Sequence, residues 1–478
     1  MTEQHDSYLV FLKRDCPTCV LVEPALRELE SAGKILQVWS QDDPEFPGSL
    51  TAVGDDRELE QSYHWQVETV PTVIRLRGDK EVERTEGWDR AAWLNLFGTQ
   101  QLAEDLPGFR PGCGSLSVQP GVAEELALRY GTSSLQARRI EIAELEDPLE
   151  ACYARGWSDG LPVVPPTELR VIRMLAGTHR EPAEIVGLIP PDLQPCSIEK
   201  IAINAVMAGC KPEYLPVVIA AVEAALIDEF CMHGLLATTW FSSPMIIVNG
   251  PITKAIGMNS GGNALGQGNR ANATIGRALQ LVIRNVGGGK PGGVDRATLG
   301  NPGKYTFCFA EDESEQRWQS VAQQRGFESQ QSTVTLFAAD GVQGIADQKS
   351  REPESLCRSL AASLLGVGHR KFAMLSDAFI VLCPEHLRVF TNAGWSKQQV
   401  LDRLFELTTR SGAELINGVD GIAEGMPEFV KDMQLAKFKP NGLNIVCAGG
   451  TAGLFSAIVP GWLASGDMGS SPVTKEIV

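Results

Sequence analysis

Residues 7–33 read SYLVFLKRDCPTCVLVEPALRELESAG, and this stretch decides the fold expected for the first part of the chain. The apolar run at its start predicts a buried strand, and the helical spacing of apolar side chains after the CPTC turn predicts an amphipathic helix. Cys16 therefore lies at a helix N-terminus, where unpaired backbone N–H groups and the helix dipole favour a thiolate. Because the thiolate is the nucleophilic form, we expect Cys16 to attack and Cys19 to resolve the mixed disulfide.

The remaining elements before residue 100 continue this alternation of strand and helix. Short apolar runs bounded by turn residues predict strands, and apolar side chains three or four residues apart predict helices. The expected order over this part of the chain is β-α-β-α-β-β-α. The elements after the first helix are a strand at 35–39, a helix at 57–65, strands at 70–78 and 81–88, and a helix at 89–98.

On these features, residues 5–100 resemble the thioredoxin superfamily. The strand–CPTC–helix unit, the element order and the VPTV stretch that contains Pro71 carry the resemblance. It implies that Cys16 attacks a disulfide, that Cys19 resolves it, and that Pro71 follows a cis peptide bond and shapes substrate approach. The chain departs from the common WCGPC pattern, because Asp15 replaces the tryptophan and Pro-Thr replaces Gly-Pro. The Asp15 carboxylate should raise the pKa of the thiols, so we expect a dedicated partner rather than general disulfide reduction.

Chain length, net charge and cysteine number limit the class of protein. A chain of 478 residues predicts two or three domains, and a formal net charge of −17 disfavours binding to nucleic-acid phosphates and anionic membranes. The sequence has no apolar run of transmembrane length and begins without a secretory signal pattern, so we expect a cytoplasmic protein. In that reducing compartment most of the eleven cysteines should be free thiols.

Composition also divides the chain. Residues 1–100 are expected to form the thioredoxin-like domain, and the Pro-, Gly- and Ser-rich residues 101–120 a linker. Residues 121–478 are expected to form a larger mixed α/β catalytic region, with a division into two subdomains near 330–370 left open. The expected fold class is therefore α/β, a thioredoxin-like domain fused to a larger mixed region.

Strand–turn–helix patterns favour an α/β sheet in the larger region. Residues 378–386 read as a strand entering a helix, and residues 395–410 as an amphipathic helix with Ser396 as its N-cap. A further strand at 443–450 is followed by an expected helix at 451–459. The phrases DGLPVVPPT, INAVMAGCKPEYLPVV and NSGGNALGQGNRANATIGRA are similar to an uncharacterised bacterial family found with thiol and selenol proteins, and this resemblance implies no reaction.

Three cysteines of the larger region are candidate nucleophiles. Cys231 lies two residues from His233, which could act as its base. Cys210 lies at an expected helix end, and Cys447 at the carboxyl end of an expected strand, where open α/β sheets hold their ligands. For each of these residues, ordinary packing is the alternative.

A glycine-rich stretch between residues 244 and 304 is the candidate substrate pocket. Backbone amides exposed by glycine can bind anions, especially beside a helix N-terminus such as the one expected at 270. Tight turns in an irregular domain are the alternative. The side chains expected to bind a carboxylate- or phosphate-bearing molecule are Asn263, Asn269, Arg270, Lys290 and Lys304.

The sequence favours a fusion enzyme. The redox-active pair Cys16–Cys19 would pass reducing equivalents to the larger region, which would perform thiol-dependent reductive cleavage or sulfur transfer on a small, anionic organic substrate. A thiol reductant or a reductase protein is the expected redox partner, and homo-oligomerisation stays open. One alternative is a lyase or hydrolase with a regulatory thioredoxin-like domain. Another is a thiol-rich metal-handling protein, although the sequence lacks a second CxxC or an HxxxH pair to complete a zinc site.

Overall fold

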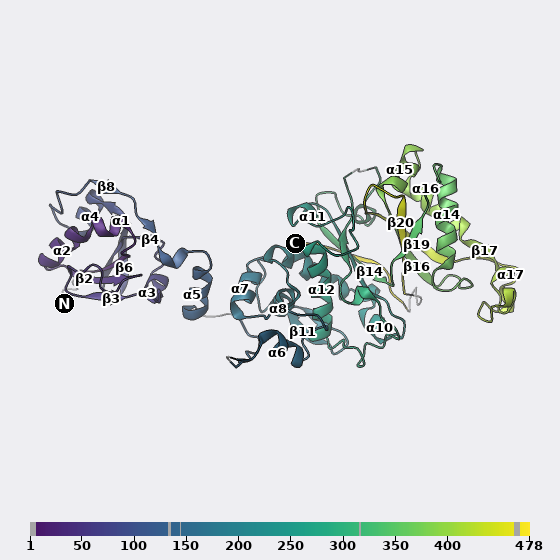
Figure 1. The fold of residues 1–478 in the computed structure, drawn as a ribbon, viewed down its shortest axis with the longest axis horizontal. Helices are drawn as coiled ribbons and strands as arrows, with labels where there is room; N and C mark the ends of the chain where they lie inside the picture. The colour runs from purple at the N-terminus through teal and green to yellow at the C-terminus, as the bar shows by residue number, and fades with distance from the viewer. Residues whose placement is uncertain (1–5, 132–134, 144, 315–316, 463–468) are drawn as a thin grey trace. The chain divides into compact units, whose positions relative to one another are not determined.

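The parts of the chain that the computed structural model describes are residues 6–131, 135–143, 145–314, 317–462 and 469–478. The protein is mixed α/β and forms two compact units, Met1–Ser134 and Leu135–Val478, each of which is described by itself (Figure 1). Among the described residues, no helix has the length and apolar character needed to cross a membrane.

The first unit is built on a five-stranded mixed sheet. Its strands, in spatial order, are β3 (Val53–Asp55), β2 (Ile35–Ser40), β1 (Asp6–Leu12), β5 (Thr72–Arg77) and β6 (Lys80–Glu86). The central strand β1 pairs in parallel with β2 and antiparallel with β5. Val10 and Phe11 on β1 are fully buried, as the apolar run at the start of the chain predicts.

The helices of the first unit are α1 (Pro17–Leu21), α2 (Glu23–Ser31), α3 (Glu60–His64) and α4 (Arg90–Phe97). The single helix expected after the CPTC turn is therefore divided into α1 and α2. Pro24 lies in the first turn of α2 and has no N–H to donate to the preceding turn, which explains the division. Asp89 caps α4 by accepting from the backbone N–H groups of Ala91 and Ala92.

Residues 101–120 are not a free linker, contrary to the sequence-based expectation. Two short strands in this stretch, β8 (Phe109–Arg110) and β9 (Cys113–Gly114), pair with β7 (Trp88–Asp89) and β4 (Thr69–Val70) of the first unit. The 3₁₀ helix η1 (Leu116–Val118) and helix α5 (Val122–Tyr130) follow them.

Burial explains why this segment belongs to the first unit. Leu102 and Ala103 are buried in its core, and the indole N–H of Trp88 donates to the Pro107 carbonyl at 2.6 Å. On α5, the ring of Tyr130 lies 6.1 Å from that of Tyr63. The first unit thus extends to Ser134 rather than ending near residue 100.

The second unit contains two four-stranded sheets. The first has, in spatial order, β13 (Cys308–Ala310), β12 (Ser243–Asn249), β14 (Thr333–Ala339) and β21 (Val473–Glu476). The second has β15 (Gln343–Ala346), β20 (Phe455–Pro460), β16 (Ser376–Leu382) and β19 (Phe438–Cys447). Every residue of β12, β14 and β16 is buried, which requires a layer on each face of both sheets.

The alternation of side chains along the strands builds four layers. On β12, Met245 and Ile247 pack into a core shared by both sheets, whereas Ile246 and Val248 face a core shared with helices. On β16, Phe379 points into the core between the sheets, and its ring lies 4.9 Å from that of Phe337 on β14. The order of layers is helix, sheet, sheet, helix.

Helices cover the outer face of each sheet. In Figure 1 α8 and α12 lie side by side against the first sheet, and α14 and α16 lie against the second. Ser396 caps α16 with a capping box, as predicted. The covering helices are α8 (Ile198–Ala208), α9 (Leu215–Ala225) and α12 (Arg270–Asn285) on the first sheet, and α14 (Pro353–Gly366), α15 (Pro384–Asn392) and α16 (Lys397–Leu407) on the second.

Shorter elements complete the second unit. Its small helices are α6 (Pro148–Ala154), α7 (Glu168–Leu175), α10 (Met232–Ala237), α11 (Ile252–Ala255), α13 (Val321–Gln324) and α17 (Gly412–Leu415). Its two-stranded ribbons are β10 (Ile185–Ile189) with β11 (Gln194–Ser197), and β17 (Thr409–Ser411) with β18 (Gln434–Ala436). Its 3₁₀ helices are η2 (Pro212–Tyr214), η3 (Asp228–Phe230), η4 (Pro302–Lys304), η5 (Val419–Gly421) and η6 (Glu428–Val430).

One expectation for the larger region is wrong, and a question that the sequence left open is answered. Residues 451–459 do not form a helix, because Phe455–Pro460 is strand β20, which pairs antiparallel with β16. Residues 456–459 are all buried in the sheet, and the strand pairing overrides the local pattern. A division into two subdomains near 330–370 is also absent, because the two sheets share one core within a single compact unit of described residues.

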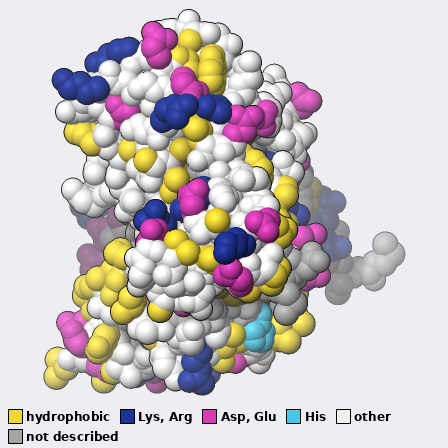
Figure 2. Space-filling model, turned by 90° about the vertical axis from the view of Figure 1, so that its right-hand side faces the viewer, with side chains coloured by type: hydrophobic (Ala, Val, Ile, Leu, Met, Phe, Trp, Pro, Cys, Tyr) yellow, Lys and Arg dark blue, Asp and Glu magenta, His cyan; other side chains and the backbone are white. Residues whose placement is uncertain are grey.

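Charged side chains are mixed on the surface. On the face that Figure 2 shows, Lys and Arg side chains are interspersed with Asp and Glu, and apolar side chains form small groups between them. The surplus of acidic residues is therefore not gathered into one patch on this face.

Candidate functional site

The CPTC pair lies where the first unit's central strand meets its first helix. Cys16 is the N-cap of α1, and its sulfur accepts a hydrogen bond from the Cys19 backbone N–H at 3.4 Å. The Cys16 sulfur also lies 3.6 Å from the carbonyl oxygen of Val70. The next peptide bond, Val70–Pro71, is cis, as expected. Both cysteines are unbridged thiols and both are fully buried.

The two thiols differ sharply in acidity. A hydrogen bond from the Cys19 side chain, with further ones from Cys113 and backbone N–H groups, lowers the pKa of Cys16 to about 5. Burial strongly raises the pKa of the Cys19 thiol. The rise expected for Cys16 from Asp15 is wrong, because Asp15 is exposed and the hydrogen bonds to the sulfur outweigh it. Cys16 is therefore a thiolate at neutral pH, and Cys19 is a thiol.

A third thiol, Cys113, belongs to the same site. Its strand β9 pairs with β4 so that Cys113 lies opposite Val70, and its side chain is hydrogen-bonded to Cys16. Sequence analysis missed this residue because it lies in the stretch interpreted as a linker. Its position between Pro-Gly and Gly-Ser was the available signal, since glycines on both sides allow a close approach of two backbones.

In the second unit the structure does not favour two of the candidate cysteines. Cys210 is buried, and burial raises its pKa to about 12, so it is a protonated thiol. Cys231 has a left-handed backbone (φ 53°) between η3 and α10 and packs against the core of the first sheet. His233 is exposed on α10.

The third candidate, Cys447, leads to a different cysteine. Cys447 ends β19 and lies opposite Leu382, the last residue of β16. The residue after Leu382 is Cys383, which caps α15. Cys383 and Cys447 therefore lie at the carboxyl ends of two neighbouring parallel strands, which is where open α/β sheets hold their ligands.

Cys383 forms a hydrogen-bonded cluster with His386 and Ser456. The backbone N–H of Cys383 donates to Ser456 Oγ at 3.2 Å, and Ser456 Oγ lies 2.7 Å from Nδ1 of His386. The other ring nitrogen, Nε2, lies 3.0 Å from the carbonyl oxygen of Asp347. A carbonyl oxygen only accepts, so Nε2 carries a proton and the ring orientation is set. All three side chains are buried.

Hydrogen bonds within the cluster shift the pKa values of Cys383 and His386 toward their charged forms. Burial opposes the thiolate of Cys383, but hydrogen bonds from His386 lower its pKa below the ordinary value. Burial also opposes the imidazolium of His386, but its hydrogen bond with Cys383 raises its pKa. A thiolate beside an imidazolium is the arrangement of an activated cysteine. Sequence analysis did not single out His386, because Ser456 and Asp347 approach it only through the tertiary fold.

A cavity of about 390 Å³ lies at this cluster. Ser456 lines it, together with Gly449 at the end of β19 and Asn263 from the glycine-rich stretch. The backbone N–H of Gly449 donates to the carbonyl of Ser260, which joins the two loops. Gly449 has φ +117°, a conformation that side-chain-bearing residues rarely adopt.

The expected anion-binding residues are dispersed. Asn263 lines the cavity, and its amide donates to the Gln267 carbonyl. Asn269 instead caps α12, and the Arg270 guanidinium donates to the Gly209 carbonyl at 2.9 Å. Lys304 is paired with Asp295 at 2.9 Å, and Lys290 is exposed.

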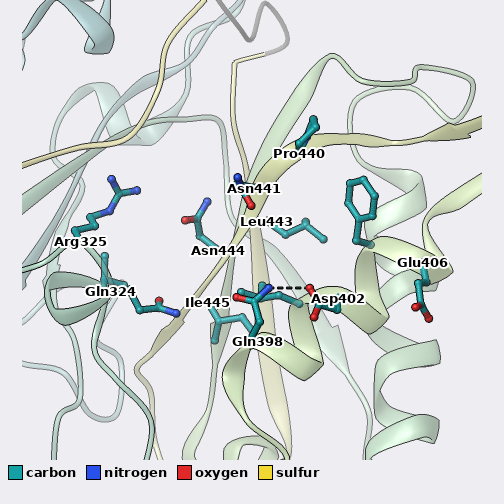
Figure 3. Close-up of a pocket in the computed structure, with 13 residues that line it drawn as sticks. Gln324, Arg325, Gln398, Asp402, Glu406, Pro440, Asn441, Leu443, Asn444 and Ile445 are labelled. Atoms are coloured by element: carbon teal, nitrogen blue, oxygen red, sulfur yellow. Dashed lines mark hydrogen bonds between the residues drawn. The ribbon is translucent and has the colours of Figure 1, made fainter.

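Two other cavities lie in the second unit. One, of about 580 Å³, is shown in Figure 3, where Gln398 donates to Asp402 on α16 at 2.7 Å and Asn444 on β19 points into the opening. The other, of about 1000 Å³, includes Trp157 and Asn285 in its lining. The five expected anion-binding residues do not line either one.

Over the described ranges, no group of three or more His, Cys, Asp or Glu side chains is placed to hold a metal ion. No family model matches the chain, and no curated protein matches it.

Proposed function

We propose that the first unit is a thioredoxin-like thiol–disulfide exchange module. The observation that carries this proposal is the difference in acidity between Cys16, with its pKa of about 5, and Cys19, whose pKa burial raises. A thiolate beside a protonated thiol supplies the attacking group and the resolving group in the right protonation states.

The exchange step balances in atoms and electrons. The Cys16 thiolate attacks one sulfur of a disulfide, and the other sulfur leaves as a thiolate. Cys19 then loses its proton to that leaving thiolate and attacks the Cys16 sulfur, which releases the second substrate thiol. The substrate disulfide gains two electrons, and the Cys16–Cys19 disulfide forms. A thiol reductant or a reductase protein must supply two electrons to restore the pair.

We further propose that the second unit is the dedicated partner, in a cytoplasmic fusion enzyme. Its role would be reductive cleavage or sulfur transfer on a small, anionic organic substrate. Cys383 replaces the cysteines favoured by sequence, because its hydrogen bonds with His386 lower its pKa and Ser456 beside it lines a cavity. The Cys383 thiolate would attack a substrate disulfide, which releases one substrate thiolate and leaves the other sulfur bound to Cys383 as a mixed disulfide. Cys16 would then attack the Cys383 sulfur and release the second substrate thiolate, and Cys19 would attack Cys16 and return Cys383 as a thiolate. Covalent fusion raises the effective concentration of the two sites.

Trapping of mixed disulfides tests the relay. The full chain with Cys19→Ser and Cys113→Ser removes both thiols that neighbour Cys16, so a captured partner stays bound. Peptide mass spectrometry is expected to show Cys16 linked to Cys383, and the link is expected to vanish with Cys383→Ser. The matched control is Cys308→Ser, because Cys308 is a buried cysteine whose pKa burial raises. Capture of external thiols alone would overturn the relay and leave the exchange module standing.

Hydrolysis at Ser456 is a second candidate function of the larger unit. Ser456 is a hydroxyl that lines a cavity, lies 2.7 Å from a histidine nitrogen, and has that histidine oriented by a carbonyl. This is the nucleophile–base–orienting-group arrangement of acyl transfer. A fluorophosphonate probe would label Ser456 and would fail to label the His386→Gln variant. Labelling of Cys383 by iodoacetamide without fluorophosphonate labelling of Ser456 would favour the thiol function.

A further inference from the structure

The CPTC pair is covered by the segment that follows the first sheet. Cys16 and Cys19 both have 0% of their surface exposed, whereas Cys113 is partly exposed. An attacking sulfur needs an approach along the S–S bond, and the partly exposed Cys113 offers a small thiol that approach more readily than the buried pair does. The partly exposed thiol beside the pair therefore provides a route by which an outside thiol reduces it.

Specific contacts hold the covering segment in place. The Thr18 hydroxyl, between the two cysteines of the pair, donates to the Pro111 carbonyl at 2.7 Å. The Lys13 ammonium donates to the Gly114 carbonyl at 2.8 Å, and the β4–β9 pairing places Cys113 opposite Val70. These contacts on both sides of Cys113 fix its side chain beside Cys16.

We propose that Cys113 is the entry thiol of the site, through which a small-molecule thiol reduces the buried pair. This inference rests on the proposed exchange function of Cys16 and Cys19. It assigns to Cys113 a covalent role that the CPTC motif does not contain.

The first step is an internal exchange. The Cys113 thiolate attacks the Cys16 sulfur of the Cys16–Cys19 disulfide, and Cys19 leaves and takes the proton that Cys113 gave up. Burial raises the pKa of Cys113, and so does the Cys16 thiolate in the reduced site. The second effect disappears once Cys16 is in a disulfide, so Cys113 is more acidic in the oxidised site, where it must attack.

The following steps complete the reduction. A small-molecule thiolate attacks the exposed Cys113 sulfur, and Cys16 leaves as a thiolate, for which its pKa of about 5 makes it a good leaving group. A second small thiol then attacks the outer sulfur of the mixed disulfide and releases Cys113. In total, one protein disulfide and two small thiols give the reduced protein and one small disulfide.

The test uses the full chain and glutathione as the reductant. Wild-type protein oxidised with diamide is digested without reduction, and peptide mass spectrometry is expected to find Cys16–Cys113 as well as Cys16–Cys19. The rate at which glutathione reduces the oxidised protein is expected to fall about tenfold or more in Cys113→Ser. It should stay unchanged in Cys231→Ser, a partly exposed cysteine of the other unit.

The outcomes separate this inference from the function on which it rests. A wild-type rate in Cys113→Ser would overturn the entry role, as would the absence of the Cys16–Cys113 peptide from oxidised wild-type protein. That peptide search needs no variant, so a folding defect in Cys113→Ser cannot hide the answer. Finding Cys16–Cys113 without any Cys16–Cys19 would overturn both the proposed role of Cys19 and the entry role, because Cys113 would then be the resolving thiol. Finding Cys16–Cys19 alone would overturn only the entry role.

Discussion

Val70 and Cys113 lie directly opposite each other in the antiparallel pair formed by β4 and β9. The Val70 carbonyl lies 3.6 Å from the Cys16 sulfur, and the Cys113 side chain is hydrogen-bonded to the same sulfur. One short strand pairing therefore places a third thiol at a site whose motif contains two.

Thiolate absorbance of the reduced protein is expected to rise with a midpoint near pH 5, and this step should be missing in Cys16→Ser. The pKa of Cys16 lies below its ordinary value of 9.0, so its contribution to folding stability is present above pH 9 and is lost as pH falls toward 5. The free energy of unfolding of the reduced wild type relative to Cys16→Ser should therefore decrease from pH 9 to pH 5. A midpoint of 8 or higher would contradict the hydrogen-bonded thiolate.

Gly112→Ala is expected to separate Cys113 from Cys16. A Cβ at this position would lie 2.4 Å from the Thr69 side chain and 2.8 Å from the Val70 carbonyl, so β9 must move away from β4. The yield of the Cys16–Cys113 disulfide after diamide treatment should drop, and the thiolate midpoint of Cys16 should rise. Gly114→Ala is the matched control, because a Cβ there meets no atom within 4 Å. Equal yields in the two variants would show that the pairing does not position Cys113.

Asp340→Asn is expected to stabilise the second unit at neutral and higher pH. Burial raises the pKa of Asp340 to about 7, although Ser242 and Trp240 donate hydrogen bonds to its carboxyl group. The pKa of Asp340 is higher in the folded protein than its ordinary value near 4 in the unfolded chain. Its contribution to the free energy of unfolding is therefore fully present below pH 4 and is lost as pH rises through 7. The variant should therefore gain, relative to wild type, up to about 4 kcal/mol between pH 4 and pH 8. Urea unfolding at pH 4 and pH 8 measures the difference in the free energy of unfolding between the variant and wild type. A difference that is the same at both pH values would refute the prediction.

Phe379→Ala is expected to cost about 3–5 kcal/mol of folding free energy, because it opens a cavity between the two sheets. Phe379 is fully buried and its ring meets that of Phe337 on the opposing sheet. Phe429→Ala is the control, since its side chain is 79% exposed and its loss should cost little. Similar unfolding free energies for the two variants would argue against a shared core between the sheets.

The local sequence pattern was sufficient to predict most of the strands and helices of the first unit. The apolar run before Cys16 and the helical spacing after it predicted β1 and the α1–α2 segment, and β2, α3, β5, β6 and α4 lie in the predicted order. The short edge strand β3 was not predicted. In the second unit, β16, α15 and α16 were also predicted, because strand-to-helix transitions with caps are encoded by residues close together in the chain.

These local patterns could not predict contacts between residues that lie far apart in the chain. The strand β20 was expected to be a helix, because its own residues do not reveal that β16 would pair with it. The cluster of Cys383, His386 and Ser456 needed that same pairing, since it brings Ser456 to the start of α15. Some candidates, such as Cys231 with His233, were chosen because they are neighbours in the sequence. Among the described residues, these candidates do not form such a cluster.

The sequence by itself determined where the CPTC pair lies, since a CPTC turn between an apolar strand and an amphipathic helix places Cys16 at a helix N-terminus. The tertiary structure alone decided which groups surround that pair and how it is reached. Cys113 joins it through a two-residue strand whose pairing with β4 has no signal in local periodicity. The physical reason is that periodicity reports which face of a segment is buried, whereas the partner of that face is chosen by hydrogen bonding and packing across the whole unit.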